Sequence, residues 1–357
     1  MNKKNIALVR LFSQQIASHQ FTSAKDLVGW MGAMQAQDYA MAKWAIGVRL
    51  PNSTDKIVAA AIDKGEIIRT HLMRPTWHFV SSDDIYWMLD LTAAGIKNSM
   101  KSRHEQMGLT KSVFSKTAKI IEKELRDENH LTRDELVLKF NIAGISTGNN
   151  RASHIFFRLE LDQLICSGSS KNGKPTYALL EERVPKKKSV PRDDALARLA
   201  GKYFSSHGPA TLNDFIWWSG LSVKDARLAT ETVKDKFTIE QIDSQFYFFP
   251  DSFPPAKSAA DSMYLLPAFD EFIISYKDRK ASLTSEDHTK AVSNNGIFHP
   301  VIVSGGEVIG TWRRTVNKNK IEMETKLFNP APASVEKKVE RAFGLFKNFL
   351  NGAVKSS

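Results

Sequence analysis

A pair of glutamines two residues apart is the part of this sequence best suited to do chemistry. Gln35 and Gln37 lie in the run Met34-Gln35-Ala36-Gln37-Asp38. On a helix, residues two apart point roughly 160° away from each other, so both amides can share a direction only if the backbone leaves the helix here. An amide oxygen accepts a hydrogen bond and the NH₂ group donates, so the pair can position a water molecule without deprotonating it. The alternative is two solvated glutamines in a polar turn.

Other catalytic signatures do not compete with this pair. The sequence has no Walker loop and no Gly-x-Ser-x-Gly motif. Gly305-Gly306 is expected in a hairpin with no helix after it, which argues against a nucleotide-binding loop. His71 and His78 lack a third ligand nearby in the sequence, so polar residues of a hairpin are favoured over a metal site. We therefore predict no metal and no other cofactor. Asp38 is either a hidden carboxylate of the site or, as we expect, the cap of a helix that starts near Ala40.

The elements that must position these residues recur three times along the chain. Each copy has a helix with a hydroxyl residue at its start and acidic residues in its first turn, which satisfy free N–H groups and suit the helix dipole. The three segments are 21–28, 131–137 and 210–216. Helices are expected before them over 5–18, 112–127 and 193–206, and after them with caps at Asn149 in the second copy and Ser222 in the third.

Each copy is predicted to end in a β-hairpin. The clearest lies within 164–180 and has Asn172-Gly173 at its turn, a strong hairpin signal. The third is expected at 237–249, around Asp243-Ser244-Gln245, and the first at 67–80, with its turn at 72–75. Three helices and a hairpin make a winged helix. The alternative is a set of unrelated helices and hairpins that happen to alternate.

The C-terminal part follows a different pattern. It starts at 263–267. Strands are expected at 301–303, 308–312 and 321–327, followed by a helix that Ser334 caps. Linkers are expected at 181–192 and 250–258, which contain prolines. The predicted fold is α+β, with three tandem winged-helix units followed by a small α+β unit. The predicted domains are residues 1–105, 106–190, 191–255 and 256–357.

Charge and composition narrow the choice of partner. The 357 residues include 50 Lys and Arg against 39 Asp and Glu, a formal net charge of +11. This excess favours an anionic partner such as nucleic acid. The single cysteine, Cys166, excludes an internal disulfide and a Cys-cluster zinc site. No apolar run approaches the roughly 18–20 residues of a membrane helix, and a signal-peptide core is missing, so we expect a cytoplasmic protein that does not bind membranes.

The glutamine motif also resembles a known family. Gln35-Ala36-Gln37, with Arg69-Thr70-His71 and Arg74-Pro75-Thr76-Trp77-His78, is similar to the AlkZ-type winged-helix DNA glycosylases. Leu265-Leu266-Pro267-Ala268-Phe269-Asp270 and Gly310-Thr311-Trp312-Arg313-Arg314 resemble that superfamily's C-terminal segments, so the resemblance spans nearly the whole chain. The family's mark is Gln–apolar–Gln, and a related branch has Asp in place of the second Gln. This sequence resembles the Gln/Gln branch.

The resemblance implies a fold, an activity and a pair of catalytic residues. It implies three winged helices packed into a concave body that embraces DNA and removes bulky alkylated purines, including crosslinked ones. Gln35 and Gln37 would be the catalytic residues of a monofunctional N-glycosyl hydrolase. Hydrolysis of an N-glycosidic bond passes through an oxocarbenium-like state. A positioned water suffices if the leaving base is already cationic, as an N7- or N3-alkylated purine is.

Double-stranded DNA with alkylated bases is the predicted partner. Phosphates are held by basic residues on one surface, without a sequence code. The candidates are Arg313 and Arg314, together with His71, Arg74 and His78 on the first hairpin. Two other functions stay open, a non-enzymatic DNA-binding regulator and a protein-interaction scaffold. Regulators are usually symmetric dimers with one recognition helix per protomer, whereas three units in one chain suit a monomer that wraps DNA.

Overall fold

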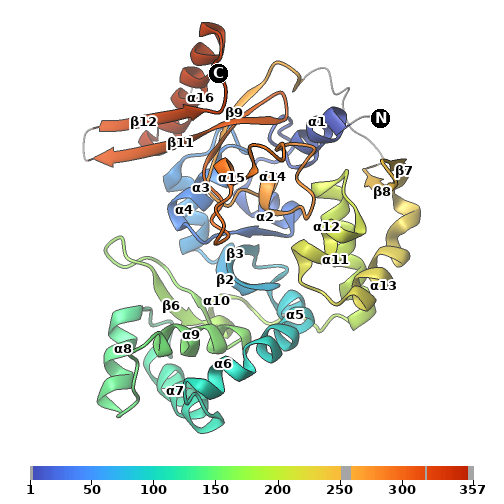
Figure 1. Cartoon of the computed structure of the whole chain (residues 1–357). Helices are drawn as coiled ribbons and strands as arrows, with labels where there is room; N and C mark the ends of the chain where they lie inside the picture. The colour runs from blue at the N-terminus through green and yellow to red at the C-terminus, as the bar shows by residue number, and fades with distance from the viewer. Residues whose placement is uncertain (1–2, 251–258, 318–319, 353–357) are drawn as a thin grey trace. The chain divides into compact units, whose positions relative to one another are not determined.

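The computed structural model describes residues 3–250, 259–317 and 320–352 (Figure 1). Helices alternate with small antiparallel sheets, so the fold is α+β, as predicted. The chain divides into two compact units. Unit 1 contains Met1–Ala59 and Leu196–Ser357, and unit 2 contains Ala60–Ala195. Helix α4, Asp55–Asp63, crosses from unit 1 to unit 2.

Unit 1 combines two distant parts of the chain. Its first part contains α1 Lys3–Ser13, α2 Ala24–Met31, β1 Ala33–Gln35 and α3 Tyr39–Gly47. The chain returns with α11 Arg192–His207, α12 Leu212–Ser219, α13 Val223–Val233, the 3-10 helix η1 Lys234–Lys236, and the hairpin of β7 Thr238–Ile242 and β8 Gln245–Phe249. Three predicted caps are confirmed here. The hydroxyls of Ser23, Thr211 and Ser222 accept hydrogen bonds from the first turns of α2, α12 and α13.

The C-terminal part of unit 1 contains a four-stranded sheet. Its strands are β9 Met263–Leu266, β10 Val301–Ser304, β11 Glu307–Asn317 and β12 Lys320–Leu327, in the order β12-β11-β10-β9. The short helices α14 Glu271–Ile274 and α15 His288–Ala291 lie between β9 and β10 in sequence, and α16 Ala333–Asn351 follows β12. In Figure 1 the β11–β12 hairpin extends well beyond the two shorter strands.

Aromatic residues join α3, the sheet and α16. The Phe346 ring lies 5.2 Å from Trp44 and 5.2 Å from Trp312, measured between ring centroids. The indole N–H groups of Trp44 and Trp312 donate to the carbonyls of Leu265 and Leu266, each over 2.8 Å. The Trp44 bond fixes α3 against β9, whereas the Trp312 bond joins β11 to β9 within the sheet.

One apolar core links the two ends of unit 1. Leu8, Leu11 and Phe12 of α1 pack in the same buried cluster as Phe272 and Val303. The first helix therefore shares its core with the C-terminal sheet. The two compact units have other boundaries than the four predicted domains. Those domains were predicted from repeats in the sequence, and they remain a prediction. The predicted boundary at 255/256 lies outside the described residues.

Unit 2 is a continuous stretch of chain. Its elements are β2 Ile67–Leu72, β3 Arg74–Ser81, α5 Ile85–Ser99, α6 Lys101–Gln106, α7 Lys111–Leu125, β4 Leu131–Thr132, α8 Arg133–Ile142, α9 Arg151–Leu161, β5 Ile165–Ser167, β6 Thr176–Leu179 and α10 Leu180–Arg183. The strands β4, β6 and β5 form one sheet in that order. At the predicted turn, Asn172 and Gly173 have φ of 53° and 73°, the positive values that a tight hairpin turn requires. The helices and hairpins agree with the predicted repeats, while their assignment as three winged helices stays a prediction.

The first hairpin turns at Met73, with φ of 58°, inside the expected segment 72–75, but β3 already begins at Arg74, before the expected strand start at Thr76. Two predicted caps are wrong. Helix α9 is preceded by Asn150 without a side-chain cap, because Asn149 and Asn150 both have positive φ instead of the extended geometry that lets an asparagine cap. Ser334 lies inside α16, because that helix already begins after Pro332.

Every helix of the described residues is too short or too polar to cross a membrane.

Candidate active site and nucleic-acid interface

The backbone leaves the helix before the glutamine motif, as the chemistry requires. Helix α2 ends at Met31, and its C-cap Gly32 has φ of 76° and donates its N–H to the carbonyl of Gly29. The positive φ favours glycine at this position. Strand β1 then ends on Gln35, and α3 begins only at Tyr39. Residues 35–37 therefore lie between two helices.

The motif runs from the interior to the surface. Gln35 is 6% exposed and Ala36 is fully buried, whereas Gln37 is exposed. Asp38 follows, and its carboxylate accepts the N–H of Met41 over 3.1 Å. Asp38 is thus the cap of α3, as predicted. A carboxylate that caps a helix is already engaged with the backbone, which favours the amides as the groups that act on substrate.

A buried glutamate holds the main chain of the motif. Glu271, 1% exposed, accepts the Gln35 N–H on Oε1 over 2.6 Å. Its Oε2 accepts the indole N–H of Trp218 over 3.2 Å and the hydroxyl of Ser275. The Nε2 atom of His207 lies 3.7 Å from the same oxygen. Burial lowers the pKa of His207, and the nearby Glu271 carboxylate only partly opposes this, so the imidazole is neutral near pH 7.

The residue before this glutamate belongs to a buried ion pair. Asp270 binds Arg49 through two hydrogen bonds, of 2.8 and 2.9 Å, and its Oδ1 also accepts the N–H of Phe272. The remaining N–H groups of Arg49 donate to the Gln14 side chain and to the carbonyls of Gln14 and Ala45. Every N–H group of the Arg49 guanidinium therefore has an acceptor, as a charged residue that is only 1% exposed requires.

Sequence reasoning did not identify Arg49, Asp270 or Glu271 as part of this site. The available signal was an adjacent pair of acids, Asp270-Glu271, directly after a buried strand. Adjacent buried acids need donors, and the sequence does not say which distant residues provide them.

Arg313 and Arg314 lie in unit 1 with the glutamines but on opposite faces of β11. Successive residues of a strand alternate between its faces. Arg313 is exposed, while Arg314 is half-buried, contacts the Met41 sulfur and lies 5.8 Å from the Phe346 ring. Because Met41 belongs to the first turn of α3, Arg314 lies beside the helix that directly follows the motif.

Arg314 also lines a basic cavity of about 700 Å³ between α3, the β11–β12 hairpin and α16. Three lysines share its wall, namely Lys43, Lys320 and Lys347. Asp55 also lines it and forms an ion pair of 2.7 Å with Lys43. Lys320 is paired as well, with Glu322 outside the lining. Four cations against two carboxylates still leave a surplus of positive charge that suits an anion such as a phosphate.

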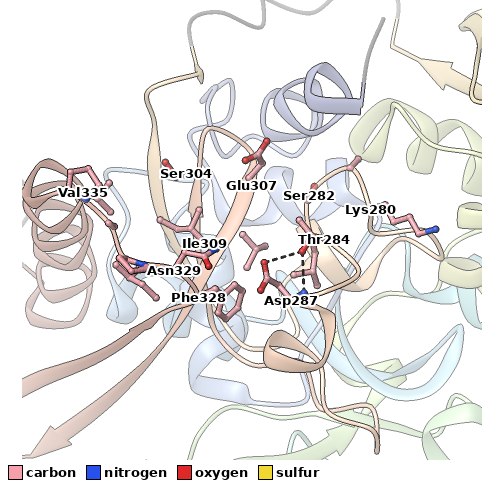
Figure 2. Close-up of a pocket in the computed structure, with 17 residues that line it drawn as sticks. Lys280, Ser282, Thr284, Asp287, Ser304, Glu307, Ile309, Phe328, Asn329 and Val335 are labelled. Carbon is pink, nitrogen blue, oxygen red and sulfur yellow. Dashed lines mark hydrogen bonds between the residues drawn. The ribbon is translucent and has the colours of Figure 1, made fainter.

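A second cavity of unit 1 has the opposite character. Figure 2 shows it, with a volume of about 400 Å³. Asp287 and Glu307 line it together with Lys280 and the apolar side chain of Phe328. Asp287 accepts a hydrogen bond from Thr284, drawn in Figure 2. Two carboxylates disfavour a phosphate here, and none of the predicted site residues lines this cavity.

The remaining predicted residues lie in unit 2, on the β2–β3 hairpin. His71 is 12% exposed, and its Nδ1 and main-chain N–H both bind the carboxylate of Glu160. His78 is fully buried. Arg74 is half-buried at the start of β3. Neither imidazole has the exposed surface that a DNA contact needs, whereas Arg74 retains part of its surface.

No group of three or more His, Cys, Asp and Glu side chains that could hold a metal ion occurs in the described ranges.

Comparisons with known proteins agree with one another. The interstrand DNA cross-link repair glycosylase of Streptomyces sahachiroi is 24% identical over 305 residues, which cover 81% of this chain and 82% of that protein. The solved structure of Streptomyces sahachiroi DNA glycosylase AlkZ shares the fold, with a TM-score of 0.78 at 23% identity over 96% of this chain and 97% of that one. The family model described as DNA glycosylase AlkZ-like matches residues 28–349. This chain therefore belongs to the AlkZ-like DNA glycosylase family.

Proposed function

We propose that this protein removes bulky or crosslinked alkylated purines from duplex DNA by hydrolysing the N-glycosidic bond. A water positioned by Gln35 and Gln37 is the nucleophile. The observation that carries the proposal is the placement of Gln35-Ala36-Gln37, outside both flanking helices and running from the interior to the surface, in a chain of this family. The relative from Streptomyces sahachiroi that is described as a cross-link repair glycosylase supports the same class of lesion.

The chemistry matches what two amides can do. An amide is a poor base, but its oxygen accepts a hydrogen bond from water and its NH₂ donates to a second group. Two such groups orient one water against the anomeric carbon, which is a contribution of proximity. An N7- or N3-alkylated purine is already cationic and leaves without protonation. A neutral, undamaged base does not, so the weakness of the site gives selectivity for damage.

DNA binding is assigned to the basic surface of unit 1. Arg313 and Arg314 are proposed to contact phosphates, together with the lysines of the basic cavity. Arg74 of unit 2 remains a proposed contact. His71 and His78 are left out because of their burial. We propose that one chain acts as a monomer built from three winged helices.

The decisive experiment is single-turnover release of a cationic N7-alkylguanine from a defined duplex. Gln35→Ala and Gln37→Ala should each lower the rate by about 10²–10³-fold while DNA binding stays nearly intact, because each removes a positioned polar group at the reacting centre. The double variant should be little slower than the slower single one, because the two amides act as a unit.

Asp38→Asn is the matched control for these variants. Asparagine caps helices about as well as aspartate does, so excision should stay near the wild-type rate. A dead Asp38→Asn with active glutamine variants would show that the carboxylate carries the reaction. If the wild-type protein releases no base from any alkylated duplex, the enzyme proposal fails and a non-enzymatic DNA-binding protein is the better description.

A second experiment tests the DNA surface. Replacing Arg313 and Arg314 together by Ala should weaken binding to damaged and undamaged duplex about equally, because phosphate contacts are indifferent to base identity. Each lost phosphate contact should also reduce the slope of log K against log salt by about 0.9. Unchanged affinity with a sharply lower melting temperature would show instead that the arginines are structural.

A further inference from the structure

We infer that Glu271 is a positioning residue for the proposed reaction, because its buried carboxylate fixes the main chain at Gln35 and thereby the placement of both amides. The inference rests on the proposed function. It assigns Glu271 no contact with substrate, since the carboxylate meets the motif at the main-chain N–H of Gln35.

The contact joins the two distant parts of unit 1. Glu271 is the first residue of α14, and its Oε1 lies 2.6 Å from the main-chain nitrogen of Gln35, 236 residues earlier in the sequence. A hydrogen bond to an ionised acceptor is shorter and stronger than one between neutral groups. It acts at the last residue of β1, where the chain turns from the strand towards Gln37. A shift of this nitrogen would displace both amides together.

The carboxylate is itself held in place from its other side. Oε2 accepts bonds from Trp218 and Ser275, so the two oxygens serve different parts of the chain. Asp270, next to Glu271, is fixed by Arg49. The acceptor that meets Gln35 therefore has little freedom to move.

Only a group with two acceptor oxygens satisfies these donors. A glutamine at position 271 has one oxygen and one NH₂ group. If its oxygen keeps the Gln35 bond, its NH₂ meets the indole N–H of Trp218, and two donors repel each other. If the side chain flips, the Gln35 N–H loses its acceptor. Removing the indole donor resolves the conflict, because the NH₂ can then donate to the hydroxyl of Ser275.

This conflict defines the test. Glu271→Gln should lower the single-turnover rate of N7-alkylguanine release by about 10–100-fold, because a displacement on the order of 1 Å at a reacting centre can cost about 10²-fold. Trp218→Phe alone should stay within a few-fold of wild type. The double variant Glu271→Gln/Trp218→Phe should be faster than Glu271→Gln alone. All rates are measured with saturating protein at a temperature where every variant is folded.

Asp214→Asn is the matched control for loss of a buried carboxylate. Asp214 is also 1% exposed, lies in unit 1 and accepts main-chain N–H groups, from Thr211 over 3.0 Å and Lys277 over 2.8 Å. These contacts lie away from the glutamine motif, so its variant should lower the melting temperature without slowing excision. If Glu271→Gln and Asp214→Asn lose excision only in proportion to their loss of stability, Glu271 is structural and the inference is wrong.

NMR of the Gln35 main-chain amide reports the contact with Glu271 directly, without any measurement of activity. In protein labelled with ¹⁵N-glutamine, the Gln35 amide proton should resonate far downfield in wild type, move upfield in Glu271→Gln and return in the double variant. A restored resonance without recovered excision would overturn the positioning role. A wild-type protein that shows the downfield resonance but releases no base would refute the proposed function, and the positioning role with it, while the contact stands.

Discussion

Each unit of the molecule uses a buried glutamate to hold a strand residue that the sequence singled out. In unit 1, Glu271 accepts the main-chain N–H of Gln35. In unit 2, the fully buried Glu160 accepts the main-chain N–H of His71 over 3.0 Å and also binds its Nδ1 atom. The contact to Gln35 reaches its main chain, whereas the contacts to His71 also take up its side chain.

The difference distinguishes Gln35, whose backbone is held by a glutamate, from His71, whose side chain is part of the core of unit 2. The His71 ring also packs against Trp77 and Phe157, with centroids 4.1 and 4.7 Å away. Its imidazole is therefore a packing and hydrogen-bonding group of unit 2. In unit 1 the glutamate binds the backbone of Gln35, and this contact fixes the place from which the Gln35 side chain starts.

The largest expected effect comes from breaking the ion pair beside the glutamate of unit 1. Asp270→Asn should destabilise unit 1 by about 3–5 kcal/mol, because Arg49 would remain buried and charged without its carboxylate. Urea unfolding, followed by hydrogen exchange of unit 1 peptides, measures this loss.

A double variant controls for the charge. Arg49→Met/Asp270→Leu removes both charges and should be less destabilised than Asp270→Asn, because no uncompensated ion is left in the interior. If Asp270→Asn unfolds at the wild-type urea concentration, the ion pair does not hold this region together.

A smaller effect is expected from the glutamate of unit 2. Glu160→Gln should lower the stability of unit 2 by about 1–3 kcal/mol. Both donors of His71 meet the single oxygen Oε2, so an amide oxygen could keep them, but the NH₂ group would be buried at the position of Oε1, which has no hydrogen-bond partner among the described residues. Excision by the folded variant should stay near the wild-type rate, in contrast to Glu271→Gln. If Glu160→Gln and Glu271→Gln slow excision equally, the glutamate of unit 1 has no special role in positioning the motif.

The smallest effect is a dependence of unit 2 on pH. Burial lowers the pKa of His104, His130 and His154 below the ordinary value of 6.5. His130 also accepts the N–H of Ser169 on Nδ1, which requires the neutral ring. The unfolded chain takes up protons first as the pH falls, so the stabilisation is complete above about pH 6.5 and is lost as the pH drops through the folded-state pKa values.

Hydrogen exchange at several pH values tests this sign. Peptides of unit 2 should lose protection between pH 6.5 and 5, and a His104→Gln/His154→Gln variant should show a shallower loss. The two rings lie 5.2 Å apart, so protonating both adds a repulsion that the variant lacks. Protection that rises on acidification would contradict the lowered pKa values.

Local chemistry made much of the fold predictable. Asn172-Gly173 supplies the positive φ of a hairpin turn, and hydroxyls such as Thr132 and Thr211 satisfy the first N–H groups of a helix, so hairpins and helix starts could be located from short segments. The caps expected at Asn149 and Ser334 were wrong because a backbone conformation and a preceding proline decided those helix starts.

The placement of the glutamine motif between two helices was also predictable, whereas the hydrogen bond from Gln35 to Glu271 was not. The spacing of Gln35 and Gln37 required a break between helices, and the structure has one. The contact to Glu271 depends on how distant segments pack, and no local pattern encodes it. The burial of His71 and His78 likewise depends on tertiary packing, so the hairpin could be predicted while the exposure of its histidines could not.

The composition of unit 1 from two distant segments has a consequence for synthesis on the ribosome. Gln35 emerges 236 residues before the glutamate that binds its N–H. At about 5–20 residues per second, the wait is roughly 12–47 s. During this interval the whole of unit 2 is made and can fold, while α1 exposes Leu8, Leu11 and Phe12, whose core partners Phe272 and Val303 do not yet exist. The nascent N-terminal segment therefore carries exposed apolar side chains until the C-terminal part of unit 1 has been made.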